Sequence, residues 1–259
     1  MGIGLAVAQT LAAEGNELVL VARGVEPLQA AVASLGVGGH SWHAFDVSDQ
    51  DGWEAIELDK LHGLVCAAAV MDPIGPIGEY SPADFKRTLE INVMGTLLAV
   101  HHCLPALRAG GGSIVTFGGG GATGPLPRFD AYAASKAAVA RLSENLATVI
   151  SPLKINCVAP GFVATRLHDA TLAAGADAVG SDFFERTRKT VEAGGFPASE
   201  AAALVSFLVN DPPFTGKLIS AQWDPWRNAA FHERLATAAD FATVRRIDGV
   251  QFGSLEGNE

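Results

Sequence analysis

Tyr132 and Lys136 stand four residues apart in a segment whose composition predicts a helix from Asp130 to about Ile150, with Asp130 as its N-cap. Residues four apart lie on one face of a helix. An ammonium group beside a phenol favours the phenolate and lowers the phenol pKa from about 10. Such a phenol can donate a proton to a carbonyl at neutral pH. By themselves, however, two residues at this spacing are more often ordinary exposed side chains on a helix.

Four consecutive glycines, Gly118 to Gly121, come shortly before this pair. Glycine has no side chain, so such a run is tolerated where the backbone approaches another group closely or adopts unusual dihedral angles. The run follows the apolar residues 113–117, which are expected to form a strand. We therefore expect a ligand to approach the backbone where that strand ends.

Short apolar runs alternate with helical segments along the whole chain. The expected strands are residues 17–22, 41–45, 63–68, 113–117, 154–159 and 216–221, and the main expected helices are 26–35, 83–107, 130–150 and 199–208. This alternation predicts an α/β fold with a parallel sheet that is covered on both faces. Ligands of such sheets bind beyond the carboxyl ends of the strands, where Asp46, Ala67 to Ala69, the four glycines and Pro160-Gly161 would meet.

The composition limits the kinds of molecule that the chain is expected to bind and indicates its location. The 259 residues are 49% hydrophobic and 18% charged, and the net charge is −10, which argues against nucleic acid or an anionic membrane. No apolar run approaches the ~18 residues of a membrane helix, and the N-terminus lacks the basic start of a signal peptide. Three cysteines without paired spacing indicate free thiols in a reducing, cytoplasmic location, and no metal-ligand motif is present.

Six stretches, taken in order, make the chain resemble a short-chain dehydrogenase/reductase from Gly2 to about Trp226. They are the phosphate-loop end Gly2-Ile3-Gly4, the adenine-contacting pair Asp46-Val47, the strand end 64–69, the helix Asn in Ile91-Asn92-Val93, the Tyr132/Lys136 pair, and the nicotinamide loop 160–165. Each stretch is a weak signal alone, but their shared order is specific. The resemblance implies a Rossmann-like, doubly wound parallel sheet in three α/β/α layers.

The resemblance also implies a reaction, namely hydride transfer between a nicotinamide cofactor and a carbonyl or secondary alcohol carbon of a small substrate, without a metal. In that scheme Tyr132 exchanges the hydroxyl proton, Lys136 holds the nicotinamide ribose and lowers the Tyr132 pKa, and Asn92 keeps a water in the proton relay. The implied cofactor-binding residues are Gly2, Ile3, Gly4, Arg23, Asp46, Val47, Ala67, Ala68, Tyr132, Lys136, Pro160, Gly161, Val163 and Thr165. Because Arg23 suits a 2′-phosphate and Ala22 stands at the acidic position, we expect NADP rather than NAD.

The sequence departs from the family pattern in three places. The family's opening strand has no counterpart, which would leave a slot of two strand spacings, about 9.6 Å, between two unpaired strand edges. Glycine, Gly119 or Gly118, stands where the family has its catalytic serine, and neither Thr116 nor Thr123 is in register to replace it. The family's Asn-Asn turn after the third strand is Cys66 followed by three alanines.

These departures leave more than one function open. The first expectation is an NADP-dependent oxidoreductase, and the second is a catalytically impaired member that acts as a dinucleotide-binding or interaction subunit. A sugar-nucleotide epimerase or dehydratase on the same scaffold is a third.

We expect residues 1–259 to form one domain, with 164–195 as a substrate lid and 222–259 as a C-terminal extension. By resemblance, the helices at 83–107 and 130–150 would form the interface of a homodimer or homotetramer.

Overall fold

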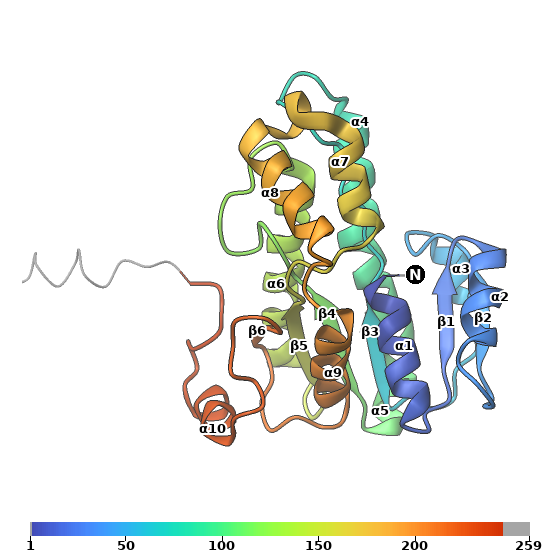
Figure 1. Cartoon of the computed structure of the whole chain (residues 1–259). Helices are drawn as coiled ribbons and strands as arrows, with labels where there is room; N and C mark the ends of the chain where they lie inside the picture. Colours follow the sequence, from blue (N-terminus) through green and yellow to red (C-terminus); the bar gives the residue numbers. More distant parts are fainter. Residues whose placement is uncertain (1, 246–259) are drawn as a thin grey trace, which may run out of the picture.

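Two parallel sheets form the centre of the computed structural model, which describes residues 2–245, with no account of the Arg166 side chain (Figure 1). The smaller sheet has the order β1-β2, and the larger has the order β3-β4-β5-β6. The strands are β1 (Val19–Ala22), β2 (Ser41–Ala44), β3 (Gly63–Cys66), β4 (Ser113–Phe117), β5 (Lys154–Ala159) and β6 (Leu218–Ser220). The predicted parallel α/β architecture is confirmed; β4 and β5 have the expected bounds, and the other four strands are one to three residues shorter.

Helices cover both faces of the larger sheet (Figure 1). The helices are α1 (Ile3–Ala13), α2 (Val25–Ala33), α3 (Gln50–Glu54), α4 (Pro82–Leu89), α5 (Gly95–Gly110), α6 (Asp130–Val149), α7 (Arg166–Val179), α8 (Ser181–Glu192), α9 (Ala198–Val209) and α10 (Ala229–Thr237). Helices α5 and α6 pack on one face, and α9 packs on the other with α1 beside it. None of the helices within residues 2–245 is long and apolar enough to span a bilayer.

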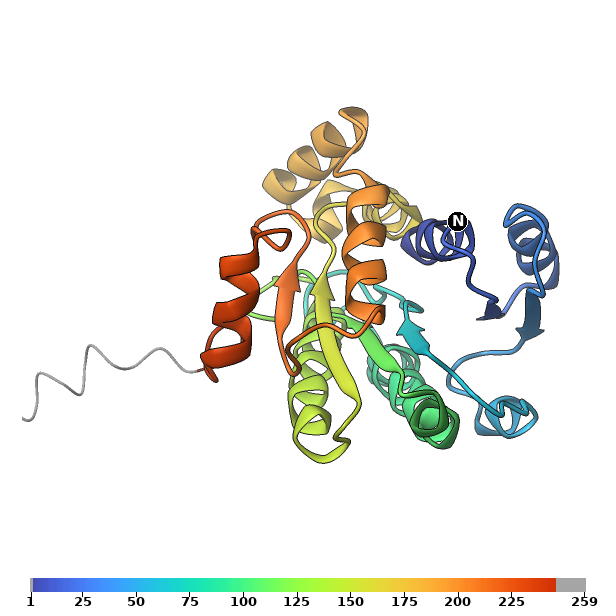
Figure 2. The same cartoon turned by 90° about the horizontal axis from the view of Figure 1, so that it is seen from below.

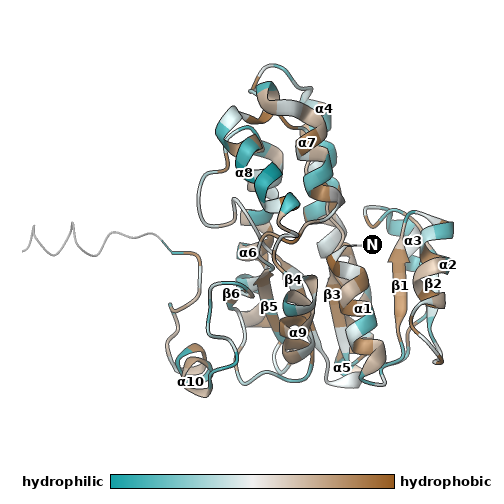
Figure 3. Cartoon of the chain, in the orientation of Figure 1, coloured by the Kyte–Doolittle hydropathy of each residue, from teal (hydrophilic) through white to brown (hydrophobic). Residues whose placement is uncertain are grey.

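The hydrophobic core lies around β4 and β5, as their continuous apolar runs predict. All five side chains of β4 are buried, and Ile114 and Ile155 have no solvent exposure. On one face they pack with residues of α5 such as Leu107, and on the other Val158 packs with Leu204 of α9. Figure 3 shows the apolar residues concentrated along these strands and α9. This packed centre holds the carboxyl ends of β4 and β5 in fixed positions.

Between β1 and β3 the sheet is interrupted. Strand β1 forms its ladder with β2, and β3 forms its ladder with β4, so the two strands belong to different sheets. Figure 2 shows β1 and β3 apart, with α1 on one face of the gap. The slot between two strand edges that the sequence predicts is therefore present.

Two local expectations need correction. Asp130 is the first residue of α6 rather than its N-cap, because Phe129 occupies the cap position and the Asp130 carboxylate instead accepts a hydrogen bond of 2.7 Å from the Tyr80 hydroxyl. The single helix expected over residues 83–107 is interrupted by a π-helical turn, Glu90–Met94, between α4 and α5. Such turns are frequent at functional sites, and this one carries Asn92.

Candidate active site

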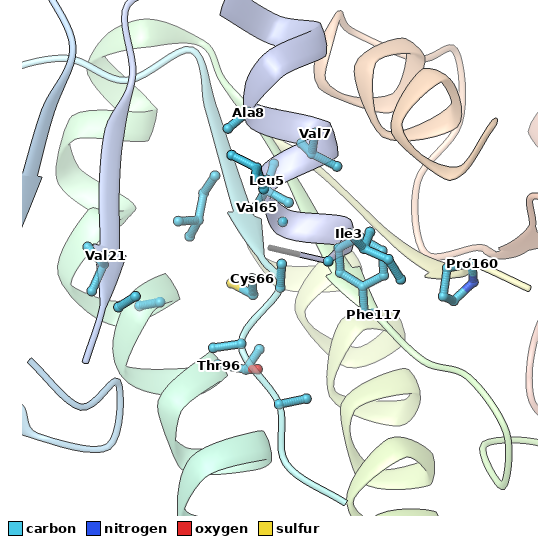
Figure 4. A pocket seen from close by; sticks show the side chains of 18 of the residues that line it. Ile3, Leu5, Val7, Ala8, Val21, Val65, Cys66, Thr96, Phe117 and Pro160 are labelled. Carbon is cyan, nitrogen blue, oxygen red and sulfur yellow. The ribbon is translucent and has the colours of Figure 1, made fainter. Parts of the chain in front are cut away.

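A cavity of about 2000 Å³ opens at the carboxyl ends of β3, β4 and β5 and continues between β1 and β3 (Figure 4). Most of the predicted site residues line it: Gly2, Ile3, Gly4, Val47, Ala67, Ala68, Tyr132, Lys136, Pro160, Gly161, Val163 and Thr165. Arg23, Asp46 and Asn92 do not line it. Residues from distant parts of the sequence therefore meet at one edge of the sheet.

Helix α6 places Tyr132 and Lys136 on the cavity wall. Both side chains are nearly enclosed, with 6% of Tyr132 and 4% of Lys136 exposed. The Lys136 ammonium donates a hydrogen bond of 3.1 Å to the backbone carbonyl of Phe117, at the end of β4. The same nitrogen lies 5.5 Å from the centroid of the Tyr132 ring. The pair is thus built into the buried junction of α6 and β4, not displayed on an exposed helix face.

The acid–base properties of the pair differ from the sequence expectation. Burial raises the pKa of Tyr132 to about 12 and lowers the pKa of Lys136 to about 8. The expected lowering of the Tyr132 pKa by Lys136 is wrong for this structure, because the ammonium is hydrogen-bonded to the Phe117 carbonyl and burial outweighs its charge. At neutral pH the phenol therefore holds its proton and is ready to donate it.

Asn92 is fully enclosed behind this wall, with 1% of its surface exposed. Its side-chain oxygen accepts from the Val70 N–H at 2.8 Å, and its nitrogen donates to the Val70 carbonyl at 2.8 Å and to the Ser135 hydroxyl at 2.9 Å. The Ser135 hydroxyl in turn donates to the carbonyl of Tyr132 at 2.7 Å. Asn92 therefore ties the segment after β3 to the helix turn that carries Tyr132.

The glycine run passes directly beside the phenol. A Cβ atom added to Gly119 would lie 3.2 Å from the Tyr132 hydroxyl oxygen, whereas one added to Gly118 would point at Cys157 Sγ and Leu218. Gly119 has a φ of 131°, in a region that side-chain-bearing residues rarely adopt. Of the two candidate positions for a polarising hydroxyl, Gly119 is therefore the one that faces the proton donor. The nearby Thr116 hydroxyl is buried against Ser143.

The N-terminus of α1 meets two loops at the same edge. A Cβ on Gly2 would lie 3.7 Å from Thr165 Cγ2, and a Cβ on Gly4 would lie 3.5 Å from the Ala67 Cβ. No side chain caps the first turn of α1, so its N–H groups are free to bind an anion. Small residues and an uncapped helix start suit the close approach of a dinucleotide pyrophosphate, which these residues would hold.

Arg23 and Asp46 lie together at the ends of β1 and β2. Arg23 Nη1 is 3.9 Å from Asp46 Oδ2, and the same carboxylate accepts hydrogen bonds from Ser48 and Arg87. Burial opposes ionisation of Asp46, but the Ser48 hydrogen bonds and the charges of Arg87 and Arg23 outweigh it and lower the pKa of Asp46. Sequence analysis did not identify Arg87, because it reaches this carboxylate from a residue 41 positions away.

His168 of α7 is a further cavity residue that the sequence analysis did not single out. Its ring packs against Phe162 with centroids 3.8 Å apart and the ring planes tilted by 32°. Burial lowers the pKa of His168, and its Nδ1 is the one buried side-chain nitrogen or oxygen within the described residues that has no hydrogen-bond partner. Only its position in the expected lid 164–195 hinted at a role, since a single histidine carries no motif. No cluster of potential metal ligands occurs within residues 2–245.

Comparisons with known proteins agree with this geometry. The family model described as "Enoyl-(Acyl carrier protein) reductase" matches residues 1–216. Dehydrogenase/reductase SDR family member 4 of Sus scrofa is 30% identical over 222 residues, which cover 81% of this chain and 77% of that protein. Cis-4-hydroxycyclohexanecarboxylate dehydrogenase of Sinomonas cyclohexanicum is 33% identical over 223 residues, 79% of this chain and 88% of that protein. The structure of an NAD⁺-bound xylitol dehydrogenase superposes with a TM-score of 0.74 at 26% identity, covering 84% of this chain and 92% of that one.

Proposed function

The chain belongs to the short-chain dehydrogenase/reductase superfamily, and we propose that it interconverts a carbonyl and a secondary alcohol on a small substrate with NADP as cofactor. The observation that carries this proposal is the buried Tyr132 hydroxyl, which lies in the main cavity beside Lys136 and close to the glycine run. A protonated phenol in this position can supply the proton that the reduction of a carbonyl takes up.

The cofactor, when bound, supplies or accepts the hydride. The protein's own residues then have three tasks. Tyr132 holds the proton that passes to the carbonyl oxygen, and its pKa of about 12 favours the direction of reduction because the phenol is protonated at neutral pH. Lys136 places a positive charge beside the phenol and can contact a ribose hydroxyl. Asn92 holds the helix turn that carries Tyr132 in place through its hydrogen bond to Ser135. The proton relay that the resemblance assigns to Asn92 is part of this proposal.

NADP is favoured over NAD by two arginines near Asp46, namely Arg23 at the end of β1 and Arg87 of α4. Arg87 is paired with both Asp46 and Glu90, whereas Arg23 lies 3.9 Å from Asp46, which leaves the Arg23 guanidinium as the group placed to bind a 2′-phosphate. Arg23 has 67% of its side chain exposed and is free to move onto such a group. Neither arginine lines the main cavity, so we assign them to the adenosine end of the cofactor.

A second candidate function is that of a dinucleotide-binding subunit with impaired catalysis. The observation that favours it is the absence of a hydroxyl at Gly119, the position that faces Tyr132. Loss of one donor to a developing oxyanion lowers the rate by roughly 10²–10³. Backbone N–H groups of the glycine run would restore part of this stabilisation. The first candidate therefore predicts slow but measurable turnover.

Both candidates predict NADPH binding, and turnover separates them. NADPH binding is measured by fluorescence titration of the full chain, and the titrated protein is then tested with a panel of small ketones and aldehydes. NADPH binding followed by consumption of a carbonyl supports the oxidoreductase. Binding without consumption of any carbonyl supports the impaired subunit, and absence of NADPH binding contradicts both.

We infer a homodimer or homotetramer in which the continuous helix of α4, the π-helical turn and α5 takes part. Met94 and Leu97 are partly exposed on this helix, at 44% and 36%. Exposed apolar side chains on a helix favour burial against a second copy. Size-exclusion chromatography with light scattering measures the assembly, and a monomer at micromolar concentration would contradict this inference. A cytoplasmic location remains a prediction.

A further inference from the structure

The wall around the Tyr132 side chain is apolar and comes from three separate segments. Tyr132 shares a buried cluster with Met71, Phe129 and Val179, and the partly buried side chains that pack against it include Leu126, Leu167 and Phe183. These residues come from the loop after β3, the loop before α6, and the helices α7 and α8. Figure 1 shows α7 and α8 together beyond the carboxyl edge of the larger sheet. The proton donor therefore lies in an apolar compartment.

This apolar compartment is part of the main cavity and reaches the proton donor itself. Four of its side chains line the cavity, namely Met71, Leu126, Leu167 and Phe183. A Cβ added to Gly119 would lie 3.2 Å from the Tyr132 hydroxyl oxygen, and one added to Gly120 would lie 3.6 Å from Leu126 Cδ2. Apolar contact therefore begins one residue along the chain from the point where a carbonyl would meet the phenol.

Contacts between the segments hold the compartment in shape. The fully buried Thr171 hydroxyl of α7 donates a hydrogen bond of 3.4 Å to Met71 Sδ. The rings of Phe129 and Phe183 have their centroids 5.1 Å apart, which joins the loop before α6 to α8. The Arg128 guanidinium donates a hydrogen bond of 3.0 Å to the Ala178 carbonyl at the end of α7. The compartment is thus built before any ligand enters, and the Thr171 hydroxyl is already engaged.

The cationic groups of the cavity are not directed at this compartment. Among the described residues that line the cavity, Lys60 and Lys136 are the cations. Lys60 precedes β3 and so belongs to the opposite, amino end of that strand, and the Lys136 ammonium donates to the Phe117 carbonyl at 3.1 Å. Helix α7 contributes the exposed Asp169 and the partly buried His168, whose pKa is lowered by burial so that it is neutral at neutral pH. An anionic group in the compartment would lose its hydration without a counter-charge from these residues.

We propose that the substrate is an uncharged carbonyl compound whose apolar body fills the compartment beside Tyr132, with Leu167 and Phe183 as residues that set this specificity. This inference deepens the proposed function and rests on it. Removal of apolar surface from water supplies the affinity, and a carboxylate or phosphate on that body is rejected because its charge would be buried without a partner. The unpartnered Nδ1 of His168 leaves room for one neutral hydrogen-bonding group on the substrate.

The test compares 4-acetylbenzoate with its methyl ester, which share the ring and the ketone and differ in charge at the far end. The Kd of each compound is measured by calorimetry with the full chain, both without nucleotide and with NADP⁺, which cannot reduce the ketone. The ratio kcat/KM is then measured with NADPH. We expect the ester to bind at least about 10²-fold more tightly than the carboxylate, and to be preferred by a similar factor in kcat/KM.

Three variants test the assignment to named residues. Leu167→Lys and Phe183→Lys each place an ammonium group in the compartment, from α7 and from α8 respectively. Either should tighten the binding of 4-acetylbenzoate about tenfold or more and weaken that of the ester, because the carboxylate gains a charged hydrogen-bond partner. Ala173→Lys adds the same charge at an exposed position of α7 that does not line the cavity, and should leave both Kd values unchanged. Because the two compartment variants lie on different helices, the test remains decisive if one of them fails to fold.

The outcomes separate this inference from the proposed function. Tighter binding of the ester, with no turnover of either ketone, supports the apolar compartment and counts against the oxidoreductase. Turnover that favours the carboxylate supports the oxidoreductase and overturns the inference. The inference is also overturned if neither compound binds, if both bind equally well, or if a folded lysine variant in the compartment keeps the parent's preference.

Discussion

Replacing Gly119 by serine should convert a slow enzyme into a faster one. A Cβ at this position lies 3.2 Å from the Tyr132 hydroxyl, so a serine hydroxyl would stand beside the group that donates the proton and could polarise the same carbonyl. One added oxyanion donor is worth about 10²–10³ in kcat, or roughly 3–4 kcal/mol. The closeness of that contact requires the phenol to shift by a few tenths of an ångström.

The substitution has a cost in stability. Gly119 has a φ of 131°, and a residue with a side chain held there is strained by an amount of order 1–3 kcal/mol. Gly119→Ala introduces the same strain and the same displacement of Tyr132 without a hydroxyl. Gly118→Ser introduces a hydroxyl that points at Cys157 and Leu218 instead. The first variant controls for strain, and the second controls for the position of the hydroxyl.

The assay is the initial rate of NADPH consumption with a carbonyl substrate that the parent turns over, at saturating NADPH. We expect kcat to rise by about 10² or more in Gly119→Ser and to stay at or below the parent value in both controls. Thermal unfolding should show equal losses of stability for Gly119→Ser and Gly119→Ala. The reasoning is refuted if Gly119→Ser is no faster than Gly119→Ala, or if Gly118→Ser gains as much.

Three further predictions concern other parts of the site. Because the pKa of Lys136 is lowered to about 8 in the folded chain, the unfolded chain binds more protons above that pH. The free energy of unfolding should therefore rise between pH 8 and 9, and denaturant titrations of Lys136→Met should lack this rise. Arg23→Ala should weaken NADPH binding about tenfold with little effect on NADH, and equal losses in fluorescence titrations would contradict the assignment. His168→Ala should raise the KM of the carbonyl substrate and leave the Kd of NADPH unchanged, because His168 lines the cavity and its buried Nδ1 has no hydrogen-bond partner within the described residues; an unchanged KM would argue against a contact with the substrate.

The features that sequence reasoning predicted correctly depend on local patterns. The runs 113–117 and 154–159 form strands over the same residues as predicted, because a strand buried on both faces is predominantly apolar. The four-residue spacing of Tyr132 and Lys136 places them on one wall because helical geometry fixes that relation. The interruption between β1 and β3 was predicted from the family resemblance, because the family's opening strand has no counterpart in this sequence.

The features that sequence reasoning got wrong or did not identify depend on contacts between distant residues. The pKa of Tyr132 is raised because burial, which depends on the whole fold, outweighs a neighbour on the same helix. Arg87 contacts Asp46, which lies 41 residues away in the sequence. Asn92 is hydrogen-bonded to Val70, which lies 22 residues away. The unpaired nitrogen of His168 becomes visible only when every neighbour of the ring is known. None of these has a signature in local spacing.

The central claim is that Tyr132 donates the proton, and the parent and Tyr132→Phe test it most directly. NADPH affinity is measured for both proteins by fluorescence, and a single turnover of a reducible ketone is then followed at saturating NADPH. We predict equal NADPH affinity and a rate for Tyr132→Phe that is at least about 10² lower, the contribution expected of a general acid. A Tyr132→Phe variant that binds NADPH and keeps the parent's rate would contradict the account.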